Sequence, residues 1–103
     1  MANNFPYLGT DLKYRLAIQA EGFSMVSDYF NVVITNGVNS IKITKDDCAT
    51  DGQGNYYIMF NSSDLGPGVV KAIITAYVPD NDFSDSFREE VFVIERLTKI
   101  LDV

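Results

Sequence analysis

The chain is predicted to be all-β, a single antiparallel β-sandwich domain of six or seven strands spanning residues 1–103. Three observations predict this class. Apolar and polar residues alternate with period two in most segments, and turn-forming residues separate these segments at short intervals. No segment has an apolar 3.6-residue period long enough for a helix. The length of 103 residues fits one domain, and the hydrophobic content of 47% predicts a folded core.

Two strands are predicted in the first third of the chain. Residues 11–19 alternate, and their apolar face consists of Leu12, Tyr14, Leu16 and Ile18. The other face carries charged side chains, which is typical of a half-buried strand. The next strand is expected over residues 29–35, with an inward face formed by Phe30, Val32 and Ile34.

A tight hairpin is expected directly after this second strand. Asn36-Gly37 is the dipeptide that most favours a tight hairpin, because both residues tolerate positive φ. Ile41 and Ile43 then alternate with polar residues and mark the returning strand.

The second half of the chain is predicted to hold a loop and three strands. Residues 45–55 are polar and contain two glycines, which indicates a loop. Residues 56–61 are apolar on both faces, as in a central or interface-facing strand. Residues 69–78 form the longest strand, with an inward face of Val70, Ala72, Ile74, Ala76 and Val78. The last strand, residues 89–97, has two alternative inward faces, Val91 with Val93 or Phe92 with Ile94.

The charge balance excludes several classes of partner. The net charge is −6 and the chain contains no histidine. An acidic chain repels phosphate groups, so neither nucleic acid nor an anionic membrane surface is expected as a partner. Residues 1–6 contain neither the basic region nor the apolar region that is typical of a secretory signal. Synthesis in the cytoplasm is therefore expected. Cys48 is the single cysteine, and the preceding carboxylates are expected to disfavour its thiolate form.

No enzymatic activity and no cofactor are expected. Without histidine the chain has no ordinary base near neutral pH, and Cys48 has no companion that would activate it. Asp46-Asp47 is interpreted as a pair of turn residues. Gly52-Gln53-Gly54 precedes a strand and lacks the lysine and helix of a phosphate loop.

Residues 79–88 are expected to form an acidic tip between the last two strands. The oxygen-bearing side chains of Asp80, Asp82, Ser84 and Asp85 suggest a calcium loop. An EF-hand loop starting at Asp80 would need Gly at the sixth position and Glu at the twelfth, where this chain has Asp85 and Val91. The EF-hand pattern therefore fails, and a looser calcium site in a sandwich loop stays open as an alternative.

The same tip carries two aromatic side chains, Phe83 and Phe87. Two interpretations are open: one or both rings fold back to cap the core, or they anchor a protein partner within a ring of carboxylates. Tyr57 and Tyr77 face outward from their predicted strands and are candidates for the same kind of contact. The partner-contact residues predicted on this basis are Tyr57, Tyr77, Asp80, Asp82, Phe83, Asp85 and Phe87.

Leu65-Gly66-Pro67-Gly68, followed by an alternating strand, resembles the turn before the sixth strand of fibronectin type III and other immunoglobulin-like domains. The resemblance implies an immunoglobulin-like sandwich in which residues 79–88 match a loop often used for partner contacts. Those families usually place a tyrosine three residues after the glycine, where this chain has Lys71. The tyrosine corner is therefore absent, and the resemblance concerns the class of sandwich only.

A second resemblance covers residues 51–95. The ordered series Asp51 to Tyr56, Leu65 to Gly68 and Pro79 to Glu89 is similar to small β-sandwich proteins of bacterial prophages and mobile elements. It is also similar to the N-terminal domains of phage baseplate and tail-fibre proteins. The resemblance implies a structural or adaptor role in a virus particle, with protein partners that include further copies of the chain. The alternative hypothesis is a surface-recognition module that binds carbohydrate or calcium through residues 79–88.

Overall fold

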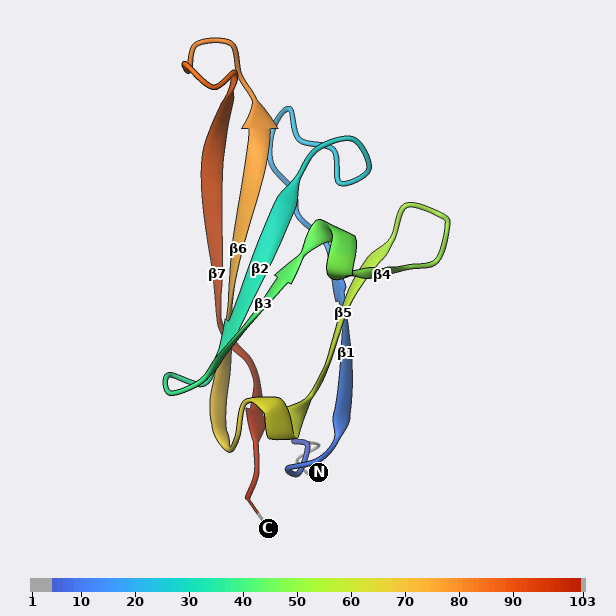
Figure 1. Cartoon of the computed structure of the whole chain (residues 1–103), viewed down its shortest axis with the longest axis vertical. Coiled ribbons are helices and arrows are strands. Elements are labelled where there is room, and N and C mark those ends of the chain that lie inside the picture. Colours follow the sequence, from blue (N-terminus) through green and yellow to red (C-terminus); the bar gives the residue numbers. More distant parts are fainter. Residues whose placement is uncertain (1–4, 103) are drawn as a thin grey trace.

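The computed structural model describes residues 5–102, which form two antiparallel β-sheets (Figure 1). In chain order the strands are β1 (Asp11–Leu16), β2 (Phe30–Thr35), β3 (Ser40–Thr44), β4 (Ala49–Thr50), β5 (Tyr56–Asn61), β6 (Gly68–Pro79) and β7 (Phe87–Ile100). The short 3₁₀ helices η1 (Lys45–Asp47) and η2 (Ser62–Asp64) lie between strands. The three-stranded sheet has the order β1-β5-β4, and the four-stranded sheet has the order β3-β2-β6-β7. The predicted all-β, antiparallel fold is confirmed.

Both sheets contribute to one hydrophobic core. β1 and β5 supply Leu16, Ile58 and Phe60, which belong to the same buried cluster as the inward faces of β2 and β6. The predicted inward face of residues 69–78 is confirmed, since all five of its side chains are buried. The predicted inward face of β2 is also confirmed, and the side chains of Phe30, Val32 and Ile34 are completely buried. The period-two pattern therefore predicted these faces correctly.

The predicted hairpin between β2 and β3 is confirmed, but its loop is longer than a tight turn. Thr35 pairs with Ser40, so the loop contains the four residues between them. Gly37 has φ +91°, whereas Asn36 is not among the residues with positive φ. Asn36 instead uses its side chain: Oδ1 accepts from the amides of Val38 at 3.0 Å and Asn39 at 2.7 Å. The tight turn is replaced by a loop that the Asn36 side chain organises.

The same side chain also ties the hairpin to a distant turn. Asn36 Nδ2 donates to the carbonyl oxygens of Leu65 at 2.9 Å and Pro67 at 3.2 Å. We expect Asn36→Ala to lower the free energy of unfolding by about 1–2 kcal/mol, because several hydrogen bonds are lost at once. Urea denaturation followed by circular dichroism measures this change. Val38→Ala in the same loop is the control, since Val38 is exposed and its loss should change stability little. Equal stability of the two variants would contradict the role given to Asn36.

Residues 45–55 are more ordered than the predicted loop. They contain η1 and β4, and β4 pairs with the start of β5, placing Ala49 opposite Tyr57. Cys48, between η1 and β4, is buried and belongs to the core cluster, not to a polar loop. The pKa of its thiol is raised, chiefly by burial and further by the carboxylate of Asp47. The predicted disfavoured thiolate is thus confirmed, but burial is the larger cause.

β6 and β7 form a long hairpin that extends beyond the three-stranded sheet (Figure 1). β7 is longer than the predicted strand over residues 89–97. Phe92 pairs with Ile74 and packs against the core, whereas Val91 pairs with Thr75 and faces solvent. This register decides between the two alternative inward faces in favour of Phe92. The register shifts between Val70 and Ala72 at a bulge in β7.

The segment between β1 and β2, residues 17–29, covers the upper part of β6. A Cβ at Gly22 would lie 3.6 Å from Val78 Cγ1, so the chain passes close to that strand. Lys45 Nζ donates to the carbonyl oxygens of Val26 at 2.8 Å and Asp28 at 2.7 Å, which fixes the second half of the segment. Near the β6–β7 turn, the core is therefore covered by this irregular segment and not by a strand.

The described ends of the chain lie side by side at the opposite end of the molecule (Figure 1). Leu8 N–H donates to the carbonyl of Leu101 at 2.9 Å, and Leu101 N–H donates to that of Pro6 at 2.8 Å. Residues 1–4, on which the expectation of no secretory signal partly rests, lie outside the described residues. Within residues 5–102, no helix has the length and apolar character needed to span a bilayer.

Candidate functional site

The turn between β6 and β7 is closed by its own backbone. Asp80 N–H donates to the carbonyl of Ser86 at 2.9 Å, and Ser86 N–H donates to that of Phe83 at 2.9 Å. Ser86 has φ +67°, a left-handed conformation that is uncommon for residues other than glycine. The turn is therefore a defined structure that presents its side chains outward.

An ion-pair cluster holds the base of this turn. Arg88 Nη1 lies 2.8 Å from Asp80 Oδ2, and Arg88 Nη2 lies 3.3 Å from Glu90 Oε2. Arg88 Nη2 also donates to the carbonyl of Glu21 at 3.2 Å, which connects the turn to residues 17–29. The pKa of the Asp80 carboxyl is lowered, first by the hydrogen bond from the backbone of Asp82 and then by Arg88. Asp80 is thus a structural residue of the turn.

The lowered pKa of Asp80 predicts a dependence of stability on pH. Because the folded-state pKa lies below that of the unfolded chain, this stabilisation is complete above about pH 4 and is lost as the pH falls through the folded-state value. Thermal melts of the wild type and Asp80→Asn should therefore differ at pH 6 and converge once the pH has fallen below the folded-state pKa of Asp80. Asp85→Asn, on the same turn but outside the ion pairs with Arg88, is the control and should follow the wild type. A constant difference between wild type and Asp80→Asn at all pH values would contradict this linkage.

Three aromatic rings meet on the outer face of the four-stranded sheet, next to the turn. The centroid of the Tyr77 ring lies 5.8 Å from that of Tyr29 and 5.4 Å from that of Phe87. Tyr77 and Phe87 meet edge to face, at an interplanar angle of 88°. Asn31 Nδ2 donates to the Tyr77 hydroxyl at 3.3 Å and so orients that ring. These rings stay partly exposed: Tyr29 is 42% and Phe87 39% accessible to solvent.

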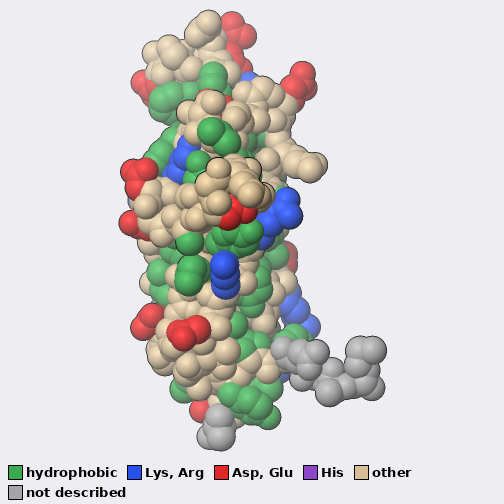
Figure 2. Space-filling view, turned by 90° about the vertical axis from the view of Figure 1, so that its right-hand side faces the viewer, with side chains coloured by type: hydrophobic (Ala, Val, Ile, Leu, Met, Phe, Trp, Pro, Cys, Tyr) green, Lys and Arg blue, Asp and Glu red, His purple; other side chains and the backbone are tan. Residues whose placement is uncertain are grey.

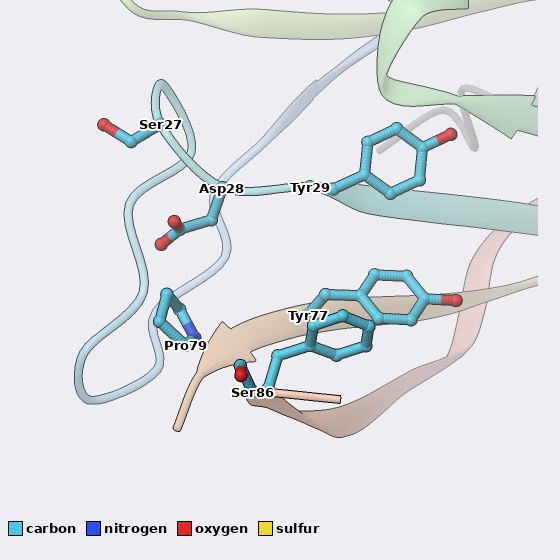
Figure 3. Close-up of a pocket in the computed structure, with 7 residues that line it drawn as sticks. Ser27, Asp28, Tyr29, Tyr77, Pro79 and Ser86 are labelled. Carbon is cyan, nitrogen blue, oxygen red and sulfur yellow. The ribbon is translucent and has the colours of Figure 1, made fainter. Parts of the chain in front are cut away.

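The rings line an open groove of about 410 Å³ (Figure 3). Its lining consists of Ser27, Asp28, Tyr29, Tyr77, Pro79, Ser86 and Phe87. The rings of Tyr29 and Tyr77 lie beside each other with their hydroxyl groups pointing in the same direction (Figure 3). An apolar hollow with polar groups at its rim suits the side chain of a partner. We call this feature the tip groove.

The structure brings together some of the predicted contact residues. Tyr77 and Phe87 share the tip groove, and Phe83 is 51% exposed in the adjacent turn. Of the two interpretations of Phe83 and Phe87, capping of the core is wrong, because both rings are accessible and neither belongs to the core cluster. Asp82 and Asp85 are exposed in the same turn and give it negative charge.

Tyr57 lies elsewhere. It is on β5, in the three-stranded sheet, and the Lys13 ammonium lies over its ring at 4.6 Å. Lys and Arg side chains interrupt the apolar patches on that side of the molecule (Figure 2). Tyr57 therefore packs within its own sheet and does not share a surface with Tyr77.

Sequence reasoning missed Tyr29 and its neighbours Ser27 and Asp28. Tyr29 reaches the groove because β2 pairs with β6, and the amide of Tyr77 donates to its carbonyl at 3.0 Å. The pairing of strands that are distant in the chain carries no local sequence pattern. The sequence indicates only that Tyr29 precedes the inward-facing Phe30, so the Tyr29 side chain should point outward.

The chemistry that this site supports is binding through apolar contact. Within residues 5–102, no group of three or more cysteine and carboxylate side chains is arranged to hold a metal ion. Comparison of the chain with family models, with curated proteins and with solved structures finds no match.

Proposed function

We propose that this chain is a non-enzymatic protein-interaction module that binds its partner in the tip groove. The observation that carries the proposal is the aromatic cluster in which the ring of Tyr77 contacts those of Tyr29 and Phe87, with Tyr29 and Phe87 open to solvent. Aromatic side chains supply much of the binding energy in protein interfaces because they bury a large area with little loss of rotamer freedom. The hydrogen bonds of the adjacent turn fix its conformation before a partner binds, which lowers the entropic cost of binding.

The charge around the groove defines the partner's chemistry. Asp28 lines the groove, and Asp82, Asp85 and Glu89 are exposed beside it. A partner segment that places an aromatic or aliphatic side chain between lysine or arginine residues matches this arrangement. The net charge of −6 favours the approach of a basic partner over long range.

The finer fold type and the biological setting form part of the same proposal. An immunoglobulin-like arrangement is supported by the strand orders, because β1-β5-β4 and β3-β2-β6-β7 correspond to the B-E-D and C′-C-F-G orders of such domains. The resemblance of residues 51–95 to prophage and phage-tail sandwich proteins supports a structural role in a virus particle. In that role, the tip groove binds a neighbouring protein of the assembly.

A peptide-display selection tests the interaction. The immobilised wild-type protein is offered a random peptide library, with counter-selection on the bare support. We expect enriched peptides that combine an aromatic or aliphatic residue with flanking basic residues. Their affinity for Phe87→Ser, measured by fluorescence anisotropy, should fall at least about tenfold, the usual effect of removing an interface anchor.

Met59→Ser is the matched control for this selection. Met59 is 57% exposed on the three-stranded sheet, so its loss removes a comparable apolar side chain at a distance from the groove. The control should bind the peptides as the wild type does. Peptides that bind Phe87→Ser and the wild type equally would refute the tip groove as the site.

A further inference from the structure

The tip groove has two walls that come from separate parts of the chain. Ser27, Asp28 and Tyr29 form one wall, and residues of the β6–β7 hairpin form the other (Figure 3). The first wall belongs to the irregular segment that ends where β2 begins, at Phe30. Residues 26–28 lie outside the strands, so side-chain contacts have to fix their position relative to the sheet.

Lys45, the first residue of η1, binds the backbone of this wall through its ammonium group. Its Nζ donates to the carbonyl oxygens of Val26 at 2.8 Å and Asp28 at 2.7 Å. These carbonyls belong to the peptide bonds that lead into Ser27 and Tyr29, which both line the groove. Hydrogen bonds from a charged donor are roughly twice as strong as those between neutral groups. One charged group therefore holds the wall at two points.

The ammonium group of Lys45 is fixed in turn by the core. It lies 5.5 Å from the centroid of the Tyr56 ring and 5.9 Å from that of the Phe30 ring, within the range in which a ring attracts a cation. These two rings meet edge to face, and Phe30 is completely buried. The Lys45 backbone is also fixed, because its carbonyl accepts from the amide of Cys48 at 3.1 Å. Lys45 thus connects the wall of the groove to the hydrophobic core.

Residues 24–28 form a turn of their own beneath these contacts. The Asp28 amide donates to the Ser24 carbonyl at 2.8 Å, and Asp28 Oδ2 accepts from the Ser24 amide at 2.8 Å. Both bonds lie within the turn and fix its shape, whereas the bonds from Lys45 link the turn to the core. Without the Lys45 ammonium group, the turn should therefore move as a unit relative to the groove.

We infer that Lys45 is the positioning residue of the tip groove, because it holds Asp28 and Tyr29 in the arrangement that binds before a partner arrives. The inference rests on the proposed function, since it concerns the same groove. Lys45 lies outside the lining of the groove, so its effect on binding is indirect. A protein whose binding-competent conformation is only partly populated binds more weakly in proportion to that population. Removing the ammonium group should weaken binding in this way.

Lys45→Met tests this role, because it keeps the apolar stem of the side chain and removes only the charged group. Well below the melting temperature, the ¹⁵N order parameters of residues 26–29 should fall from about 0.85 to about 0.6. The dissociation constant of a tip-groove peptide from the display selection should rise about tenfold, as expected when hydrogen bonds from a charged group are lost. Lys42→Met is the matched control. Lys42 is exposed on β3, so the same change there should leave both quantities at their wild-type values.

Saturation of Lys45→Met with the peptide separates positioning from a general loss of structure. In the complex the peptide orders the wall, so the order parameters of residues 26–29 should return to their wild-type values. The order parameters of β2 and β6 should stay unchanged throughout, since these strands keep their pairing. A decrease that extends to β2 and β6 would show that Lys45 only stabilises the fold and would overturn the inference.

Two further results would overturn it: unchanged order parameters of residues 26–29 in Lys45→Met, or wild-type affinity of this variant for the peptide. Either result would leave the weak binding of Phe87→Ser, and with it the proposed function, intact. If the proposed function itself is wrong, peptides will bind Phe87→Ser as tightly as the wild type, and the role of Lys45 in binding is then refuted as well. The two failures are therefore distinguishable.

Discussion

Replacing Phe30 by alanine is expected to lower the free energy of unfolding by about 3–5 kcal/mol. The ring is completely buried, and it meets Tyr56 edge to face at 5.5 Å and Phe23 at 6.5 Å between centroids. It thus connects β2, β5 and the segment between β1 and β2. Removing it leaves a cavity where both sheets and the connecting segment meet. Domains of this size have about 5–15 kcal/mol of stability in total, so the variant should be close to unfolding at 37 °C.

Urea denaturation of Phe30→Ala and Phe83→Ala provides the comparison. Phe83 is 51% exposed in the β6–β7 turn, so the same chemical change there should cost less than about 0.5 kcal/mol. A similar loss of stability in both variants would show that Phe30 does not occupy the centre of the core.

Ser62→Ala is expected to lower the free energy of unfolding by about 1–3 kcal/mol. Ser62 is completely buried at the start of η2. Its hydroxyl accepts from the amide of Gly9 at 2.8 Å and donates to the carbonyl of Tyr7 at 3.2 Å. Without it, both backbone groups lose a partner in a place that water reaches poorly, and the N-terminal segment loses its anchor.

The matched control for this prediction is Ser63→Ala. Ser63 is exposed, and its hydroxyl contacts only the neighbouring Asn61 side chain. Its loss should leave the midpoint of denaturation nearly unchanged. Amide hydrogen exchange adds a local measurement, since Ser62→Ala should accelerate exchange at Leu8 and Leu101 before it affects β2 and β6. Unchanged exchange at those two amides would contradict the anchoring role.

The inward faces of the long strands could be predicted from the sequence because they depend on alternation alone. β6 shows this most clearly: each of its even-numbered residues from Val70 to Val78 is buried. The inward face of the last strand could not be predicted in the same way, because valine, phenylalanine and isoleucine occupy both of its faces. Its open edge leaves Val91 exposed, and only the pairing with β6 determines that Phe92 turns inward.

Turn chemistry was less predictable because distant groups take part in it. Asn36-Gly37 favours a two-residue turn locally, but the Asn36 amide also satisfies the carbonyl groups of Leu65 and Pro67. The tip groove has the same kind of origin. Phe87 and Tyr77 lie on the two strands of one hairpin, whereas Tyr29 is brought to them by the pairing of β2 with β6. Long-range pairing therefore creates the parts of the site that local patterns do not reveal.

Chemical-shift mapping of a selected peptide on the ¹⁵N-labelled protein tests whether the partner binds in the tip groove. We expect the largest shifts at and next to the residues that line the tip groove, within residues 27–29, 77–79 and 86–87. Amides of β5 around Tyr57 should shift little, because they belong to the other sheet. Shifts concentrated on the three-stranded sheet, with the tip groove unaffected, would contradict the claim that this protein binds its partner through Tyr29, Tyr77 and Phe87.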